Sequence, residues 1–111
     1  MKVLVLETNL MWVSRLKLSI TALGHEPVFG SILPADLNGY GLAILNLAGP
    51  SGLEETVARL KEANIPIIAH AGHKEKELME LGASLGIDIL ASNSEMTNSL
   101  GKVLERVVRT A

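Results

Sequence analysis

The stretch Gly41–Pro50 constrains the fold more than any other part of the chain. Its run Leu42–Leu47 is apolar except for Asn46 and does not alternate between apolar and polar residues. Such a run indicates a strand covered on both faces, as at the centre of a parallel sheet. Asn46 lies near the carboxyl end of this run, where open α/β sheets form their binding crevice. Function therefore depends largely on what Asn46 can do.

Strand-like and helix-like patterns alternate along the rest of the chain. Apolar periodicity of three and four residues predicts a helix that Asn9 caps and Gly24 ends. Two capping boxes, Ser51 with Glu54 and Ser92 with Glu95, predict further helix starts, the second opening one long final helix. The other short strands are expected at Lys2–Leu6, His25–Phe29, Pro66–His70 and Gly86–Leu90, and another helix at Lys74–Leu81.

Five strands alternating with helices predict an α/β fold with three layers. Right-handed crossovers give a doubly wound, flavodoxin-like arrangement, a five-stranded parallel sheet in the order 2-1-3-4-5. The segment 30–41 is rich in Gly and Pro and can hold at most a turn of helix around Pro34–Leu37, so the second helix is shortened or lost. We expect residues 1–111 to form one domain, because this length buries a sufficient core.

Composition excludes several classes of function. The net charge is −2, and Lys and Arg are scattered along the sequence, so we expect no basic patch that could bind nucleic acid. No apolar run is long enough for a membrane span, which needs about 20 residues. With no Cys and no signal-like segment after Met1, we expect a cytoplasmic protein.

Four stretches, in this order along the chain, resemble the receiver domains of response regulators (CheY-like), which act in two-component signal transduction. The matching stretches are Lys2–Asn9, Ala22–Glu26, Leu42–Pro50 and Ile65–Ile68. Each stretch alone is weak evidence, and the resemblance depends on all four occurring in this order. The resemblance covers essentially the whole chain. The connection between the second and third strands has room for at most a turn of helix. In this it departs from the family, which has a full helix there.

The resemblance implies a set of site positions at which this chain has changed every functional residue. Receivers carry two acidic residues after strand 1, a phosphoacceptor Asp ending strand 3, a Ser or Thr after strand 4, and a Lys after strand 5. The corresponding residues here are Glu7, Thr8, Asn46, Ala71 and Asn93. The resemblance therefore implies a degenerate pseudo-receiver that lacks the phosphoacceptor Asp.

The chemistry of these changes argues against a phosphorylation cycle. The neutral amide of Asn46 is a weak nucleophile compared with a carboxylate. Phosphoryl transfer relies on Mg²⁺, whose carboxylate ligands are mostly missing. We therefore expect no enzyme activity, cofactor or metal, but a signalling module that binds protein partners independently of aspartyl phosphorylation. The resemblance also implies contacts or a homodimer through the outer faces of the last two helices, which offer Lys102, Glu105, Arg106 and Arg109.

Two alternatives remain open from the sequence. A small-ligand sensor could use neutral groups of the crevice around Thr8, Asn46 and Asn93. A hydrolytic or metal enzyme could use Glu7 with His70 and His73, although no third ligand beside the two histidines is evident. Trp12, the only Trp, lies off the apolar stripe of its helix and is expected at the crevice rim or on the surface.

Overall fold

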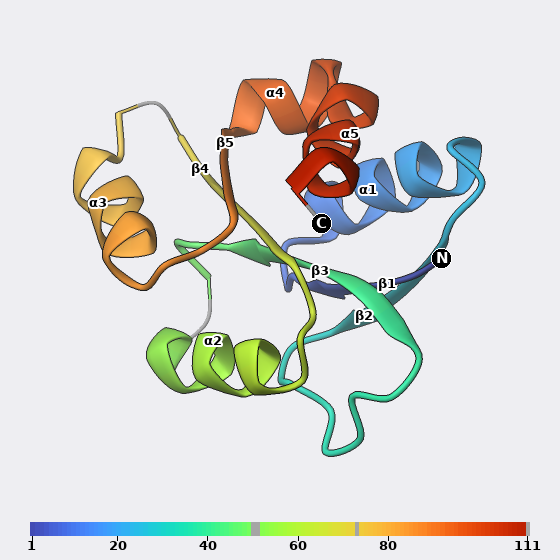
Figure 1. The fold of residues 1–111 in the computed structure, drawn as a ribbon. Coiled ribbons are helices and arrows are strands. Elements are labelled where there is room, and N and C mark those ends of the chain that lie inside the picture. The colour runs from blue at the N-terminus through green and yellow to red at the C-terminus, as the bar shows by residue number, and fades with distance from the viewer. Residues whose placement is uncertain (50–51, 73, 111) are drawn as a thin grey trace.

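A computed structural model describes residues 1–49, 52–72 and 74–110, of which residues 108–110 are described by their backbone only. The five strands form one parallel sheet in the order β2-β1-β3-β4-β5, so the predicted topology is confirmed (Figure 1). The strands are β1 (Lys2–Leu6), β2 (Glu26–Gly30), β3 (Tyr40–Asn46), β4 (Ile67–Ala71) and β5 (Ile89–Ser92).

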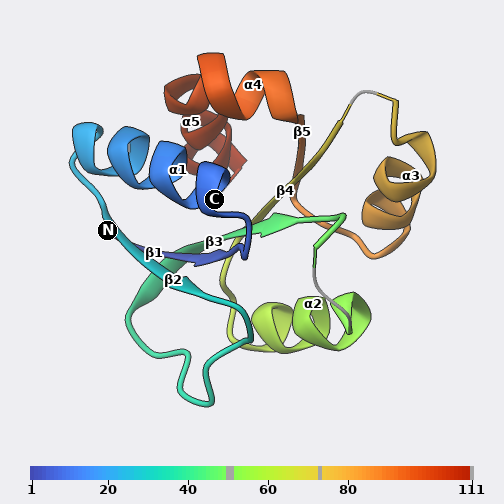
Figure 2. The same cartoon turned by 180° about the vertical axis from the view of Figure 1, so that it is seen from behind.

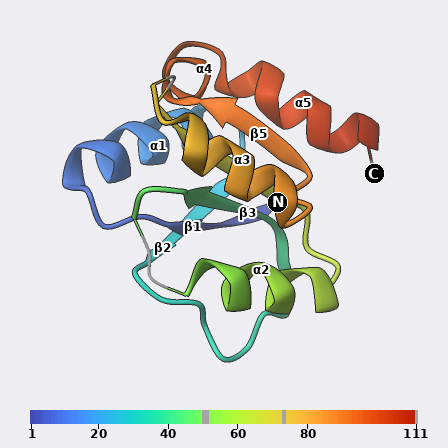
Figure 3. The same cartoon turned by 90° about the vertical axis from the view of Figure 1, so that its left-hand side faces the viewer.

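Helices cover both faces of the sheet, which gives the three layers. The views from the two sides show α1, α4 and α5 grouped on one face and α2 on the other, with α3 toward the β4–β5 side (Figures 2 and 3). The helices are α1 (Leu10–Ala22), α2 (Leu53–Glu62), α3 (Lys76–Ser84), α4 (Asn93–Asn98) and α5 (Leu100–Thr110). Among the described residues, none of these helices has the length and apolar character that crossing a membrane requires.

The central strand β3 separates two apolar cores. Leu42 and Ile44 join the core under α1, α4 and α5, whereas Ala43 and Leu45 join the core under α2 and α3. All four are completely buried. Successive side chains of a strand point to opposite faces, so a strand covered on both faces must be apolar without alternation. The interpretation of the central run is therefore confirmed.

Local signals explain the start and end of α1. The Asn9 side chain accepts a hydrogen bond from the main-chain N–H of Met11 at 2.9 Å, as a helix N-cap should. The helix ends at Ala22, and Gly24 follows with a φ of +85°, a left-handed conformation that glycine adopts without steric cost. These contacts fix the position of the β1–α1 turn, which carries Glu7.

The crossover between β2 and β3 contains no helix, so the expected loss of the second helix is confirmed. Arg59 of α2 holds this segment by donating from Nη2 to the carbonyls of Pro34 and Ala35, at 3.1 and 3.2 Å. The predicted capping box of α2 involves Ser51, which lies outside the described residues. The helix itself begins at Leu53.

The prediction of one long final helix is wrong. The capping box of Ser92 and Glu95 is present, but α4 ends at Asn98 and α5 starts at Leu100. The residues at the break, Thr97 to Ser99, are poor helix formers because their polar side chains compete for backbone groups. The Thr97 hydroxyl, for example, donates to the Asn93 carbonyl at 3.0 Å.

Candidate functional site

The carboxyl ends of β1, β3 and β4 and the start of α4 bring four polar side chains together. They are Glu7, Asn46, His70 and Asn93, and we call them the edge cluster. Three of the five positions taken from the receiver resemblance therefore meet. The other two do not enter through their side chains: Thr8 is exposed, and Ala71 is buried in the apolar core on the α2–α3 face.

Glu7 is almost completely buried, and each of its two carboxylate oxygens accepts a hydrogen bond. Its Oε1 accepts a hydrogen bond from Nδ2 of Asn46 at 2.9 Å. Its Oε2 accepts from the main-chain N–H groups of Thr8 and Asn9, at 3.1 and 3.2 Å. Three donors stabilise a charged carboxylate in a place where burial would otherwise disfavour it.

Asn46 is held from both ends of its amide. While Nδ2 donates to Glu7, Oδ1 accepts from the main-chain N–H of Ala48 at 3.0 Å. A backbone donor and a carboxylate acceptor together determine which end of the amide faces which partner. The side chain at the end of the central strand therefore presents an N–H, not an oxygen nucleophile, to Glu7.

His70 is the centre of the other half of the cluster. It is completely buried, and its Nδ1 lies 2.7 Å from Oδ1 of Asn93. An amide oxygen can only accept, so Nδ1 carries the proton and Nε2 carries a lone pair. Nε2 has no hydrogen-bond partner among the residues that the structure describes, and it lies 3.9 Å from Oε1 of Glu7.

The environment of His70 favours its neutral form. Burial lowers the pKa of the imidazole from its ordinary 6.5, although the hydrogen bond to Asn93 and the carboxylates of Glu7 and Glu75 act in the opposite direction. The Trp12 ring covers the imidazole, with ring centroids 4.8 Å apart at an angle of 54°. Trp12 is thus half-buried at the edge of the cluster.

His70 is the residue that sequence reasoning assigned too little importance. We placed it at the end of the fourth strand and considered it only as a partner of His73, whereas its ring lies against Trp12 of α1, is bonded to Asn93 of α4 and faces Glu7. Its place in the run Ile67–Ala71 was the available signal, because a central parallel strand is buried on both faces. The proposed metal partner His73 lies outside the described residues.

The cluster does not suit the Mg²⁺ that the receiver resemblance implies. Such a site needs oxygen ligands, usually from several carboxylates. Glu7 is the only carboxylate in the edge cluster, both its oxygens already accept hydrogen bonds, and Asn46 turns an N–H toward it. Within the ranges that the structure describes, no three His, Cys, Asp or Glu side chains are grouped as metal ligands.

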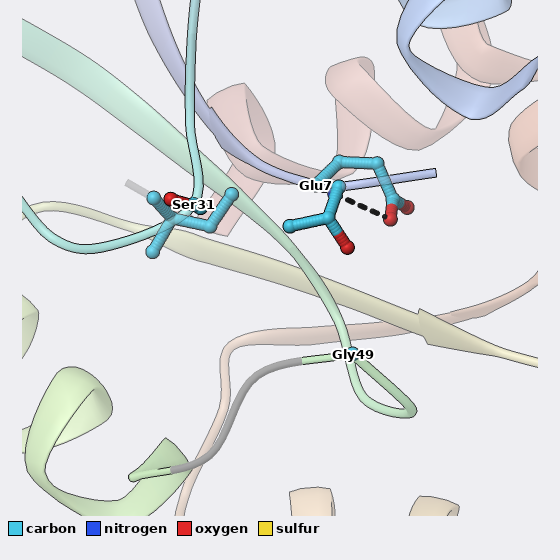
Figure 4. A pocket seen from close by; sticks show the side chains of 5 residues that line it. Glu7, Ser31 and Gly49 are labelled. Atoms are coloured by element: carbon cyan, nitrogen blue, oxygen red, sulfur yellow. Dashed lines mark hydrogen bonds between the residues drawn. The ribbon is translucent and has the colours of Figure 1, made fainter. Parts of the chain in front are cut away.

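A separate hollow lies beside the edge cluster, where the shortened crossover leaves space. It has a volume of about 270 Å³, and its polar lining includes Thr8, Ser31 and Thr56. A smaller adjoining recess is also lined by Glu7, but Figure 4 shows its carboxylate pointing away from Ser31. The hollow therefore offers hydroxyl groups and does not include Asn46 or Asn93, which the ligand alternative had placed in the crevice.

The predicted interaction face on the last two helices has mixed character. Lys102 and Glu105 are exposed. Arg106 donates to Glu95 of α4 at 2.6 Å, which joins α4 to α5. The hydrogen bond from the Ser92 backbone, and then that from Arg106, lower the pKa of Glu95. The Arg109 side chain lies outside the described part of the chain.

Comparisons with known proteins agree on the fold. No protein-family profile and no curated protein sequence matches the chain. Among solved structures, the receiver domain of the Francisella response regulator 1452 is 18% identical, with a TM-score of 0.76 over 99% of this chain and 98% of that one. HP1043, an orphan response regulator of H. pylori, is 17% identical, with a TM-score of 0.68 over 98% and 94%.

Full-length FixJ from B. japonicum is similar over part of its length. It is 17% identical, with a TM-score of 0.79 over 97% of this chain and 57% of that chain. Identities this low establish architecture and not residue roles. The chain has the flavodoxin-like fold of response-regulator receiver domains.

Proposed function

We propose that this chain is a pseudo-receiver, a non-enzymatic signalling module that binds protein partners without an aspartyl-phosphate cycle. The observation that carries the proposal is the 2.9 Å hydrogen bond from Nδ2 of Asn46 to Oε1 of Glu7. An anionic oxygen must attack phosphorus to form an acyl phosphate, and an amide that donates to a carboxylate is not such a nucleophile.

The surroundings of Asn46 support the same proposal. Phosphoryl transfer depends on positive charge around the transferred group, usually a metal ion and a Lys. Here Asn93 occupies the Lys position and donates no charge, and its oxygen is engaged by His70. The edge cluster thus has one negative charge, on Glu7, and no cationic side chain to receive a phosphoryl group.

A phosphodonor assay tests this proposal directly. The full chain is incubated with Mg²⁺ and acetyl phosphate, or with beryllofluoride, and followed by intact mass and by Trp12 emission. We expect neither a phosphoryl adduct nor a spectral change, also in the variant Asn46→Asp, because Thr8, Ala71 and Asn93 remain. A phosphorylatable receiver domain is the positive control. A stable adduct on the wild type or on Asn46→Asp would contradict the proposal.

For the partner, we propose a cytoplasmic signalling protein or a second copy that contacts the exposed side of α5. Lys102 and Glu105 provide charges of both signs there. Sedimentation equilibrium of the wild type and of Lys102→Glu tests the homodimer, and we expect the single charge reversal to weaken self-association. Glu54→Lys, on α2, is the control. A wild type that stays monomeric at every concentration excludes the homodimer but leaves other protein partners to be tested.

The hollow beside the crossover supports a second candidate, a sensor of a small neutral ligand. Its hydroxyl groups and its volume of about 270 Å³ suit a polar molecule without charge. A thermal-shift screen of neutral metabolites, with Thr56→Val as the matched variant, tests it, since ligand binding raises the melting temperature. No shift with any compound, or a shift that Thr56→Val leaves unchanged, would count against this hollow.

A further inference from the structure

One buried side-chain polar atom in the described part of the chain lacks a hydrogen-bond partner. It is Nε2 of His70, and the residue is completely buried. Buried polar groups without partners cost free energy, so each one needs a physical explanation. Oε1 of Glu7 lies 3.9 Å from this nitrogen.

The two facing atoms are both acceptors. Nδ1 of His70 uses its proton in the bond to Asn93, which leaves the lone pair on Nε2. Oε1 of Glu7 carries negative charge and already accepts from Asn46. Two lone pairs that face each other in a buried place repel, and a proton between them would convert this repulsion into a charge-assisted hydrogen bond.

We infer that Nε2 of His70 and Oε1 of Glu7 form a proton-binding site, through which pH replaces phosphorylation as the signal at this edge of the sheet. The inference rests on the proposed function, because a site that accepted phosphoryl groups would already have its signal. The proton comes from the solvent, and no covalent bond is made or broken. The imidazole gains one positive charge beside the carboxylate.

The structure indicates which contacts would respond. A protonated Nε2 draws Oε1 of Glu7 closer than 3.9 Å and competes with Asn46 for the same oxygen. On the other side of the ring, the bond to Asn93 connects His70 to the first residue of α4. Trp12, which covers the ring, belongs to α1. Proton uptake therefore affects β1, β3, α1 and α4 together.

Among the described residues, the charged groups that act on the imidazole are two carboxylates. Glu7 faces it from the end of β1, and Glu75 acts on it from the segment before α3. Asn46, Asn93 and Trp12, from β3, α4 and α1, are neutral. Burial lowers the pKa below the ordinary 6.5, while the two carboxylates favour the imidazolium, so proton uptake requires a pH below 6.5.

Imidazole NMR and Trp12 emission on the full chain test the inference between pH 8 and 5. We expect the Nδ1–H tautomer at high pH, and below pH 6.5 a single transition shared by His70, the Asn46 side-chain amide and Trp12. The control His25→Gln removes a histidine at the opposite end of the sheet and should keep this transition. His70→Gln should abolish it, and far-UV circular dichroism checks that each variant is folded.

The variant Glu7→Gln separates a paired site from a merely buried histidine. Removing the carboxylate should lower the pKa of His70 further, because Glu7 favours the charged form. An unchanged pKa in Glu7→Gln, an Nε2–H tautomer in the wild type, or unfolding before His70 titrates would each overturn the inference. If His70→Gln does not fold, the tautomer of His70 in the wild type and the change of the His70 pKa in Glu7→Gln still test the inference. Phosphorylation of the wild type would instead overturn the proposed function and leave the titration standing.

Discussion

The two halves of the edge cluster differ in how completely their polar atoms are paired. Around Glu7 and Asn46, each side-chain oxygen accepts a hydrogen bond, and Asn46 donates to Glu7. Around His70, one ring nitrogen is bonded to Asn93, and the other has no hydrogen-bond partner in the described part of the chain. The first half is built to keep one arrangement, whereas the second half can gain a partner only by binding a proton.

The largest expected effect comes from Glu7→Ala, which breaks the fully paired half. The substitution leaves Nδ2 of Asn46 and the main-chain N–H groups of Thr8 and Asn9 without their acceptor. These donors are partly buried, and an unpaired buried donor costs about 1–3 kcal/mol, so we expect a total loss of about 3 kcal/mol in the free energy of unfolding by urea denaturation. Glu7→Gln retains an acceptor oxygen and should lose about 1 kcal/mol. Equal losses of unfolding free energy in Glu7→Ala and Glu7→Gln would show that the hydrogen bonds to residue 7 do not determine the stability of this half.

A smaller effect is expected from Asn46→Asp at neutral pH. The new carboxylate oxygen meets Oε1 of Glu7 at the position where Nδ2 now donates from 2.9 Å. Two carboxylates that share a site raise the pKa of one of them, and we expect a loss of about 2 kcal/mol. The loss is largest above that raised pKa and shrinks as the pH falls, because one carboxyl group regains a proton to donate.

Urea denaturation over a pH series checks this sign. Asn46→Ala is the matched control, since it removes the same donor without adding charge, and its loss should not shrink in acid. If Asn46→Asp were as stable as the wild type at neutral pH, an unseen cation or a protonated Glu7 would have to be present. Either explanation would change the hydrogen-bond pairing around Glu7 and Asn46, and would weaken the contrast between this half of the edge cluster and the half around His70.

The third prediction concerns the unpaired half. The folded-state pKa of His70 is lowered, so the unfolded chain binds more protons below pH 6.5. Stability is therefore fully present above 6.5 and falls as the pH drops toward the folded-state pKa, by at most about 1.4 kcal/mol per pH unit. His70→Leu should flatten this slope, as measured by thermal unfolding over the pH series, and His25→Gln should retain it. An unchanged slope in His70→Leu would contradict the prediction.

The fold was predictable from the sequence because its determinants are local or periodic. The run Leu42–Leu47 is apolar since both faces of its strand are covered, and Asn9 caps α1 through a bond two residues away. Alignment of strand ends also brought Glu7, Asn46 and Asn93 to one edge. These conclusions need no knowledge of side-chain contacts between distant elements.

The cluster around His70 was not predictable in the same way. Its properties depend on Trp12 and Asn93, which lie 58 residues before and 23 residues after His70 in the sequence and meet it only in the folded chain. The break at Ser99 was missed for a related reason. The capping box at Ser92 was joined to the apolar stripe that begins at Leu100, and neither signal records side chains that compete for the backbone.

The smallest expected effect lies outside both halves, at the ion pair that joins α4 to α5. Arg106→Ala removes the 2.6 Å contact with Glu95, but both side chains are largely exposed. Water and salt screen such pairs, so the free energy of unfolding should fall by less than about 1 kcal/mol, and less in high salt. Ser92 would still cap α4 through its bond to the Glu95 main-chain N–H. The His70 transition should therefore be unchanged in Arg106→Ala, because Asn93 at the start of α4 keeps its place. A shifted transition would mean that α5 takes part in holding the unpaired half, and the cluster would then extend beyond its four residues.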